Sequence, residues 1–102
     1  MPSVESIRES LYPVFSRYRV KKAILFGSFA KGTARESSDI DIFVDSGLKG
    51  LQFFGLLEDV TACFAKPVDL IDASQITANS RVMEEIDKNG VLLYESRIGK
   101  FC

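Results

Sequence analysis

The chain has 102 residues and a formal net charge of −1, which fits a single domain over residues 1–102 and argues against a basic surface for duplex nucleic acid. It contains no histidine, so Ser-His-Asp triads, Cys-His pairs and imidazole metal sites are excluded. Its two cysteines, Cys63 and Cys102, are too few for a zinc-binding set, and we expect Cys63 to be a small core residue. Acid–base chemistry would therefore depend on carboxylates, lysine, tyrosine or cysteine.

The sequence also carries no sign of a membrane location. No basic leader followed by an apolar run stands at the N-terminus, and no apolar stretch approaches the roughly 20 residues of a spanning helix. The absence of a disulfide framework favours a reducing compartment. We therefore expect a cytoplasmic protein without a membrane partner.

Hydrophobic spacing predicts alternating helices and strands along the chain. Ser3 should cap a first helix, which Pro13 should kink or end. The predicted strands are short apolar runs at 20–26, 40–44, 68–71 and 91–94. The later predicted helices span 28–32, 51–64 and 81–88. This alternation predicts an α/β or α+β fold, with a central mixed β-sheet and helices packed mainly on one face.

Two aspartates at the start of the second predicted strand form a candidate metal site. Residues i and i+2 of a strand face the same side, so Asp39 and Asp41 should lie about 6.5–7 Å apart at Cα. Two carboxylates on one face repel each other unless a cation lies between them. Mg²⁺ takes oxygen ligands and is often held by one or two carboxylates together with substrate phosphates. The spacing is suited to that role.

A tight turn precedes this pair and could hold a phosphate group. Gly27 and Ser28 stand where a strand turns into a helix, and glycine allows close approach of the backbone to a ligand. The Ser28 hydroxyl adds a hydrogen-bond donor, and Lys31 and Arg35 are near enough in sequence to neutralise a triphosphate. By contrast, we expect the Glu84-Glu85 pair on a solvated helix face.

Chemistry with two metal ions needs a third carboxylate, for which Asp69 is the best candidate. An aspartate in an otherwise apolar strand is costly unless it is paired or bound to metal. Asp72 competes for this role, although it should point to the opposite face from Asp69. Asp45 shares the face of Asp41 but lies about 13 Å further along the strand, too far for the same metal pair.

The two motifs together resemble the signature of the DNA polymerase beta-type nucleotidyltransferase superfamily. The stretches 25–32 and 38–45 carry a Gly-Ser element, a spacer and an Asp-hydrophobic-Asp strand, and Asp69 matches the third acid. Within the superfamily the chain most resembles the minimal nucleotidyltransferases (MNT) of bacteria and archaea, which include MntA-like antitoxins. The likeness is specific from about residue 20 to residue 70 and looser elsewhere.

The resemblance implies a chemistry and a partner. In this family the motif aspartates and the third acid bind Mg²⁺, and the Gly-Ser turn binds the triphosphate. Many members pair with a helical HEPN toxin in type VII-like toxin–antitoxin modules, and some transfer AMP from ATP to a tyrosine of that toxin. The resemblance thus predicts a Mg²⁺-dependent protein adenylyltransferase (AMPylation) that acts as an antitoxin, with Asp39, Asp41 and Asp69 at two Mg²⁺ ions. It predicts nucleotide contacts from Gly27, Ser28, Lys31 and Arg35.

Two alternatives to this interpretation stay open. The chain could neutralise its partner by binding alone, without catalysis, although all three acids are intact. It could also transfer the nucleotide to a small molecule, although it has few residues to spare for an acceptor-binding domain. The sequence likewise leaves open a homodimer or a hetero-oligomer with the partner.

Overall fold

A four-stranded mixed sheet organises the computed structural model, which describes residues 3–76 and 80–96. Its strand order is β3-β2-β1-β4, and β1 runs antiparallel to both β2 and β4 while β3 is parallel to β2. The strands are β1 (Lys22–Phe26), β2 (Ile40–Asp45), β3 (Val68–Asp72) and β4 (Val91–Glu95). The predicted mixed sheet is therefore confirmed.

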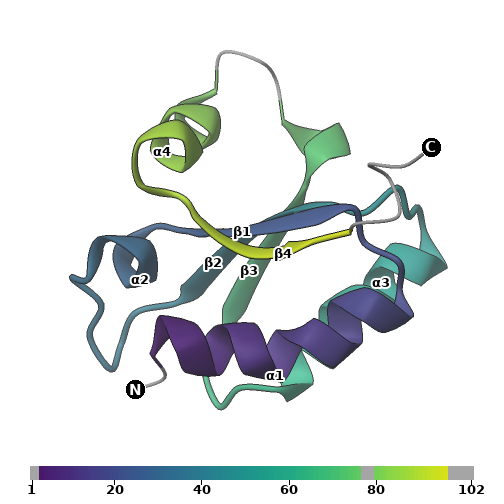
Figure 1. Cartoon of the computed structure of the whole chain (residues 1–102), viewed down its shortest axis with the longest axis horizontal. Helices are drawn as coiled ribbons and strands as arrows, with labels where there is room; N and C mark the ends of the chain where they lie inside the picture. Colours follow the sequence, from purple (N-terminus) through teal and green to yellow (C-terminus); the bar gives the residue numbers. More distant parts are fainter. Residues whose placement is uncertain (1–2, 77–79, 97–102) are drawn as a thin grey trace.

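The helices lie on both faces of this sheet but mainly on one. Figure 1 shows α1 (Val4–Arg17) and α3 (Leu51–Ala62) together on one side of the sheet, with α4 (Arg81–Asn89) on the other. A short 3-10 helix, η1 (Ala73–Gln75), follows β3, and α2 (Ser28–Lys31) follows β1. The larger core lies between the sheet and the α1/α3 layer, as the hydrophobic spacing predicted.

Side chains of β2 alternate between two hydrophobic clusters, and this alternation decides where the polar residues point. Ile40, Ile42 and Val44 are fully buried in the larger cluster with α1 and α3. The residues between them face α4, where the smaller cluster consists of Phe26, Phe43 and Ile86. Asp41 consequently lies on the face that α4 covers only in part.

The structure decides two details of the predicted elements. Of the two outcomes expected at Pro13, a kink or an end, the end is wrong: α1 continues to Arg17, and Val14 and Phe15 beyond the proline are buried. Cys63 is not a core residue, since α3 ends one residue earlier and the thiol lies exposed at its C-terminus. Cys102 lies outside the described residues.

The remaining boundaries agree with the predictions to within two residues. The first strand starts at Lys22 rather than residue 20 because Arg19 adopts a left-handed backbone, with φ of 57°, just before it. Across the described ranges, none of the helices is long and apolar enough to cross a bilayer.

Candidate functional site

Three aspartates lie near one another where β2 and β3 begin, on the face of the sheet next to α4. In the parallel register Asp41 of β2 is the partner of Asp69 of β3, so the two side chains leave the same face of adjacent strands. Adjacent strands lie about 4.8 Å apart. Asp39 stands directly before β2, two residues from Asp41. The structure therefore brings together all three acids singled out in the sequence.

Asp69 is exposed, contrary to the expectation that its charge is costly in an apolar strand. Strand β3 forms an edge of the sheet, and the Asp69 side chain is exposed, so its charge carries no large desolvation cost. The parallel register, which pairs Asp69 with Asp41, supports a role for Asp69 beside Asp41 instead. This pairing is more specific than the composition of the strand.

The electrostatics of Asp41 reflect this crowding. Burial and then the charges of Asp69, Asp39 and Glu85 raise the pKa of its carboxyl from the usual 3.8 to about 6. Glu85 belongs to α4, which places a fourth carboxylate in the same field. A perturbed acid with several acidic neighbours is typical of a cation-binding or catalytic position.

The donor set fits a hard divalent cation. Carboxylate oxygens are the ligands that Mg²⁺ prefers, and the side chains of Asp39 and Asp69 are exposed enough to be reached. Within residues 3–76 and 80–96, no three acidic or cysteine side chains are already gathered as a ready-made metal cluster. The charges of Asp69 and Asp39 disfavour the ionised form of Asp41, and a bound cation would relieve this repulsion.

The Gly27 backbone lies directly against Asp41. Gly27 has φ of 75° and ψ of −154°, a conformation that is essentially restricted to glycine. Any Cβ at this position would overlap Oδ2 of Asp41 and lie 3.1 Å from its Cγ. Ser28, the next residue, begins α2 and is half-buried. The Gly-Ser turn and the acidic cluster thus form one continuous surface.

Of the two predicted phosphate-binding cations, Lys31 lies in an ion pair and Arg35 is exposed. The Lys31 ammonium is 2.5 Å from Oε1 of Glu85, which links α2 to α4. Glu85 was predicted to lie on a solvated face; its position beside the apolar stripe of α4 indicated partial burial, but not the contact with Lys31. Arg35 lies in the loop after α2, and its side chain is in no ion pair of the described part of the chain.

Asp72, the competitor of Asp69, has a structural role on the other face of the sheet. Its buried carboxylate accepts hydrogen bonds from the Ser46 hydroxyl at 2.6 Å and the Ser74 hydroxyl at 2.6 Å. Burial disfavours the charge, but these bonds and those from the two backbone N–H groups outweigh it and lower the pKa of Asp72. Asp45 lies opposite Lys22 at the far end of β2. Neither residue belongs to the cluster.

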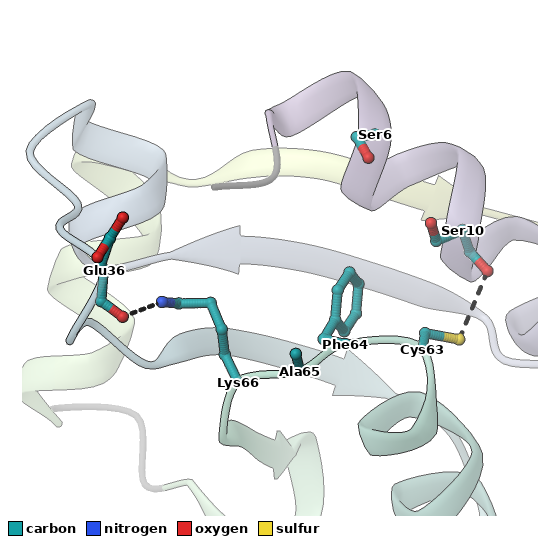
Figure 2. A pocket seen from close by; sticks show the side chains of 7 residues that line it. All are labelled: Ser6, Ser10, Glu36, Cys63, Phe64, Ala65 and Lys66. Carbon is teal, nitrogen blue, oxygen red and sulfur yellow. Dashed lines mark hydrogen bonds between the residues drawn. The ribbon is translucent and has the colours of Figure 1, made fainter.

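A pocket of about 360 Å³ lies behind the loop that leads to Asp39. Figure 2 shows Lys66 donating to the backbone carbonyl of Glu36, with Phe64 and Cys63 along the same wall. Within the same loop the Arg35 N–H donates to the Ser38 hydroxyl at 2.8 Å. None of the predicted site residues lines this pocket, so it is separate from the acidic cluster.

Solved structures share this fold. A toxin–antitoxin crystal structure with AMP-PNP matches 92% of this chain and 77% of its own, with a TM-score of 0.69 and 22% identity. A tri-AMPylated Shewanella oneidensis HEPN toxin in complex with MNT antitoxin matches with a TM-score of 0.64 and 18% identity, over 96% of this chain and 77% of that one. At these identities the likeness establishes the fold.

Sequence comparisons establish the family. A proposed protein adenylyltransferase of Methanocaldococcus jannaschii, MJ0435, is 30% identical over 76 residues, which cover 72% of this chain and 82% of the relative. A second from the same organism, MJ0604, is 29% identical over 100 residues, covering 96% and 98%. The family model described as polymerase beta, nucleotidyltransferase, matches residues 9–98. With its acidic cluster beside a glycine–serine turn, the chain belongs to the polymerase beta nucleotidyltransferase family.

Proposed function

We propose that this nucleotidyltransferase moves AMP from ATP onto a tyrosine hydroxyl of a HEPN-domain toxin and thereby acts as the antitoxin of a type VII-like module. The observation that carries the proposal is the register of Asp41 with Asp69, next to Asp39 and to the Gly27 turn. A cytoplasmic location, where ATP is plentiful, suits this activity. The proposed acceptor comes from the relatives and structural neighbours, whose names include protein adenylyltransferase and AMPylated HEPN toxin.

Asp39, Asp41 and Asp69 are the residues that would hold two Mg²⁺ ions in this proposal. When bound, the cations would neutralise charge on the triphosphate and on the acceptor oxygen as the new bond forms. Asp39 and Asp69 are exposed and Asp41 is half-buried, so the carboxylate oxygens of Asp41 would be the least mobile ligands of the site.

The Gly27-Ser28 turn and the nearby cations bind and orient the nucleotide. The backbone N–H groups at the Gly27-Ser28 turn and the Ser28 hydroxyl donate hydrogen bonds to the β- and γ-phosphates, while Lys31 and Arg35 supply positive charge. The acceptor hydroxyl attacks the α-phosphorus in line, its proton passes to Asp69, and the bond to the β-phosphate oxygen breaks to release pyrophosphate. Positioning and charge stabilisation account for most of the rate gain.

A transfer assay with matched variants tests this function. The chain is incubated with ATP labelled at the α-phosphate, Mg²⁺ and the product of its neighbouring gene as the candidate toxin, and label on that protein is measured. We expect transfer by the wild type, loss of at least a hundredfold in Asp41→Asn and Asp69→Asn, and near wild-type transfer in Asp45→Asn, which alters an acid of the same strand outside the cluster.

The same assay separates catalysis from neutralisation by binding. If the wild type transfers no label yet still blocks the toxin, and Asp41→Asn blocks it equally well, the chain is a non-catalytic antitoxin. If label appears on an added aminoglycoside or another small hydroxyl compound rather than on the toxin, the protein acceptor is wrong. Mapping of the labelled residue then checks the tyrosine assignment.

A further inference from the structure

An ion pair joins the two helices that flank the acidic cluster. Nζ of Lys31, the last residue of α2, lies 2.5 Å from Oε1 of Glu85 on α4. The Lys31 side chain is 42% exposed and that of Glu85 is 26% exposed, so water reaches the pair but does not surround it. The pair therefore connects the helix that follows the Gly27-Ser28 turn with the helix whose Glu85 charge acts on Asp41.

Helix α4 holds Glu85 in a defined place. One face of α4 packs on the smaller hydrophobic cluster through Val82, Met83 and Ile86, against Phe26 and Phe43 of the sheet. Glu85 lies beside this face and is half-buried, and its charge contributes to the field at Asp41. Its carboxylate is therefore a fixed part of the wall around the site and not a freely moving surface group.

The charges around the site are unbalanced toward the negative. Four carboxylates, those of Asp39, Asp41, Asp69 and Glu85, accompany the ammonium of Lys31. Because Glu85 already pairs with Lys31, part of the positive charge that follows the Gly-Ser turn is offset before a nucleotide arrives. A triphosphate that needs Lys31 must compete with Glu85 for it.

We propose that Glu85 is a positioning residue that holds Lys31 in the nucleotide-free protein and is displaced from it by the nucleotide phosphates. This inference rests on the proposed function, because it assumes that a nucleoside triphosphate occupies the Gly27-Ser28 turn. The Lys31–Glu85 pair is then formed in the empty site and broken when a nucleotide binds. Nucleotide affinity is then set partly by the strength of the Lys31–Glu85 pair.

Neutralising Glu85 should therefore strengthen nucleotide binding. Glu85→Gln keeps the size and the polar oxygen of the side chain, so the contact between α2 and α4 can be retained while the competing charge is removed. We expect a non-hydrolysable ATP analogue to bind about threefold more tightly at saturating Mg²⁺, which is the range of a partly exposed ion pair. Glu84→Gln is the matched control: it removes the same charge from the neighbouring, exposed position of α4 and should leave affinity unchanged.

A double-mutant cycle shows whether Glu85 acts through Lys31. Lys31→Gln should weaken binding of the ATP analogue several-fold, and adding Glu85→Gln to it should produce no further gain. Adenosine, which carries no phosphate, should bind all four proteins of the cycle equally. A merely structural role for Glu85 would give neither the tightening nor its dependence on Lys31.

Each result of these titrations has a definite meaning. Tightening in Glu85→Gln that disappears in the Lys31→Gln background supports the inference. Equal tightening in Glu84→Gln would reduce the effect to bulk charge and overturn it, and so would unchanged or weaker binding in Glu85→Gln. In those cases the wild type still binds the analogue and the proposed function stands. A wild type that binds no ATP analogue at all would overturn both.

Discussion

Replacement of Asp41 by asparagine should make the metal-free protein more stable at neutral pH while abolishing its nucleotidyltransferase activity. The carboxylate is partly buried and is surrounded by the charges of Asp69, Asp39 and Glu85, so its ionised form is held at a cost. Asparagine has nearly the same shape and removes the charge. A residue that lowers stability in the empty site is expected where function requires a concentration of negative charge.

The size and the pH range of this effect follow from the pKa of Asp41. Because the pKa is raised in the folded state to about 6, the folded protein binds this proton more tightly than the unfolded chain, so stability falls as pH rises from 3.8 to about 6. A displacement of this size corresponds to about 3 kcal/mol at most. Solvent screening of a partly exposed group reduces this to roughly 1–2 kcal/mol at pH 7.5.

Urea denaturation of wild type and Asp41→Asn at pH 4.5 and pH 7.5, in EDTA, measures the effect. We expect the advantage of the variant in unfolding free energy to be small at pH 4.5 and roughly 1–2 kcal/mol at pH 7.5. Asp45→Asn is the matched control, since Asp45 lies on the same strand opposite Lys22 and should show no such gain. The reasoning fails if Asp41→Asn is no more stable than wild type at pH 7.5, or if its advantage is independent of pH.

Added Mg²⁺ provides a second measurement on the same proteins. A cation that binds only the folded state raises its stability in proportion to the logarithm of concentration. Mg²⁺ should therefore raise the melting temperature of the wild type and do so far less in Asp41→Asn. Equal stabilisation of both proteins would place the cation elsewhere.

The remaining predictions concern the turn and the two competing acids. Gly27→Ala should lower the free energy of unfolding by roughly 1–3 kcal/mol and abolish transfer, because its Cβ would overlap Asp41 in a glycine-only conformation. Gly32→Ala, also at positive φ but in open space, should lower it by about 1 kcal/mol and keep most activity. Denaturation and transfer assays check both variants. Asp72→Asn should lose roughly 1–3 kcal/mol of unfolding free energy at pH 7 and less at pH 3, because the pKa of Asp72 is lowered from 3.8 in the folded protein and the stability this gives disappears only as pH falls below that value. A variant as stable as wild type at both pH values would contradict its structural role. Asp69→Asn should keep wild-type stability and lose transfer, the reverse pattern to Asp72→Asn, and calorimetry beside the transfer assay distinguishes the two acids.

The sheet and most of its elements could be predicted because local chemistry and tertiary packing agree there. The aliphatic residues of β2 recur at every second position and are buried, so both the strand and the shared face of Asp39 and Asp41 follow from a period of two. Ser3 is a good N-cap and accepts from the Ser6 N–H as its position suggested. The outcome at Pro13 could not be decided from the sequence because proline in a helix is disfavoured locally, yet burial of Val14 and Phe15 outweighs the missing hydrogen bond.

The site was predictable only where residues are close in sequence. The spacing of Gly27, Asp39 and Asp41 is readable along the chain, but the pairing of Asp41 with Asp69 depends on the parallel register of two strands separated by a helix. Glu85 was missed for the same reason: nothing within α4 shows that it faces Lys31, 54 positions earlier. Contacts of this kind are set by how helices pack on the sheet, which hydrophobic periodicity does not specify.

The alternation of side chains along β2 also fixes the register of this strand in the sheet. A slip of one residue in this strand would turn Ile40, Ile42 and Val44 away from the larger hydrophobic core and turn the Asp41 side chain into it. A misaligned chain would therefore lose hydrophobic packing and bury a charge. Lengthening or shortening the loop at 33–38 leaves that choice intact. Over evolutionary time, insertions should therefore accumulate in this loop, while the six residues of the strand change identity without changing in number.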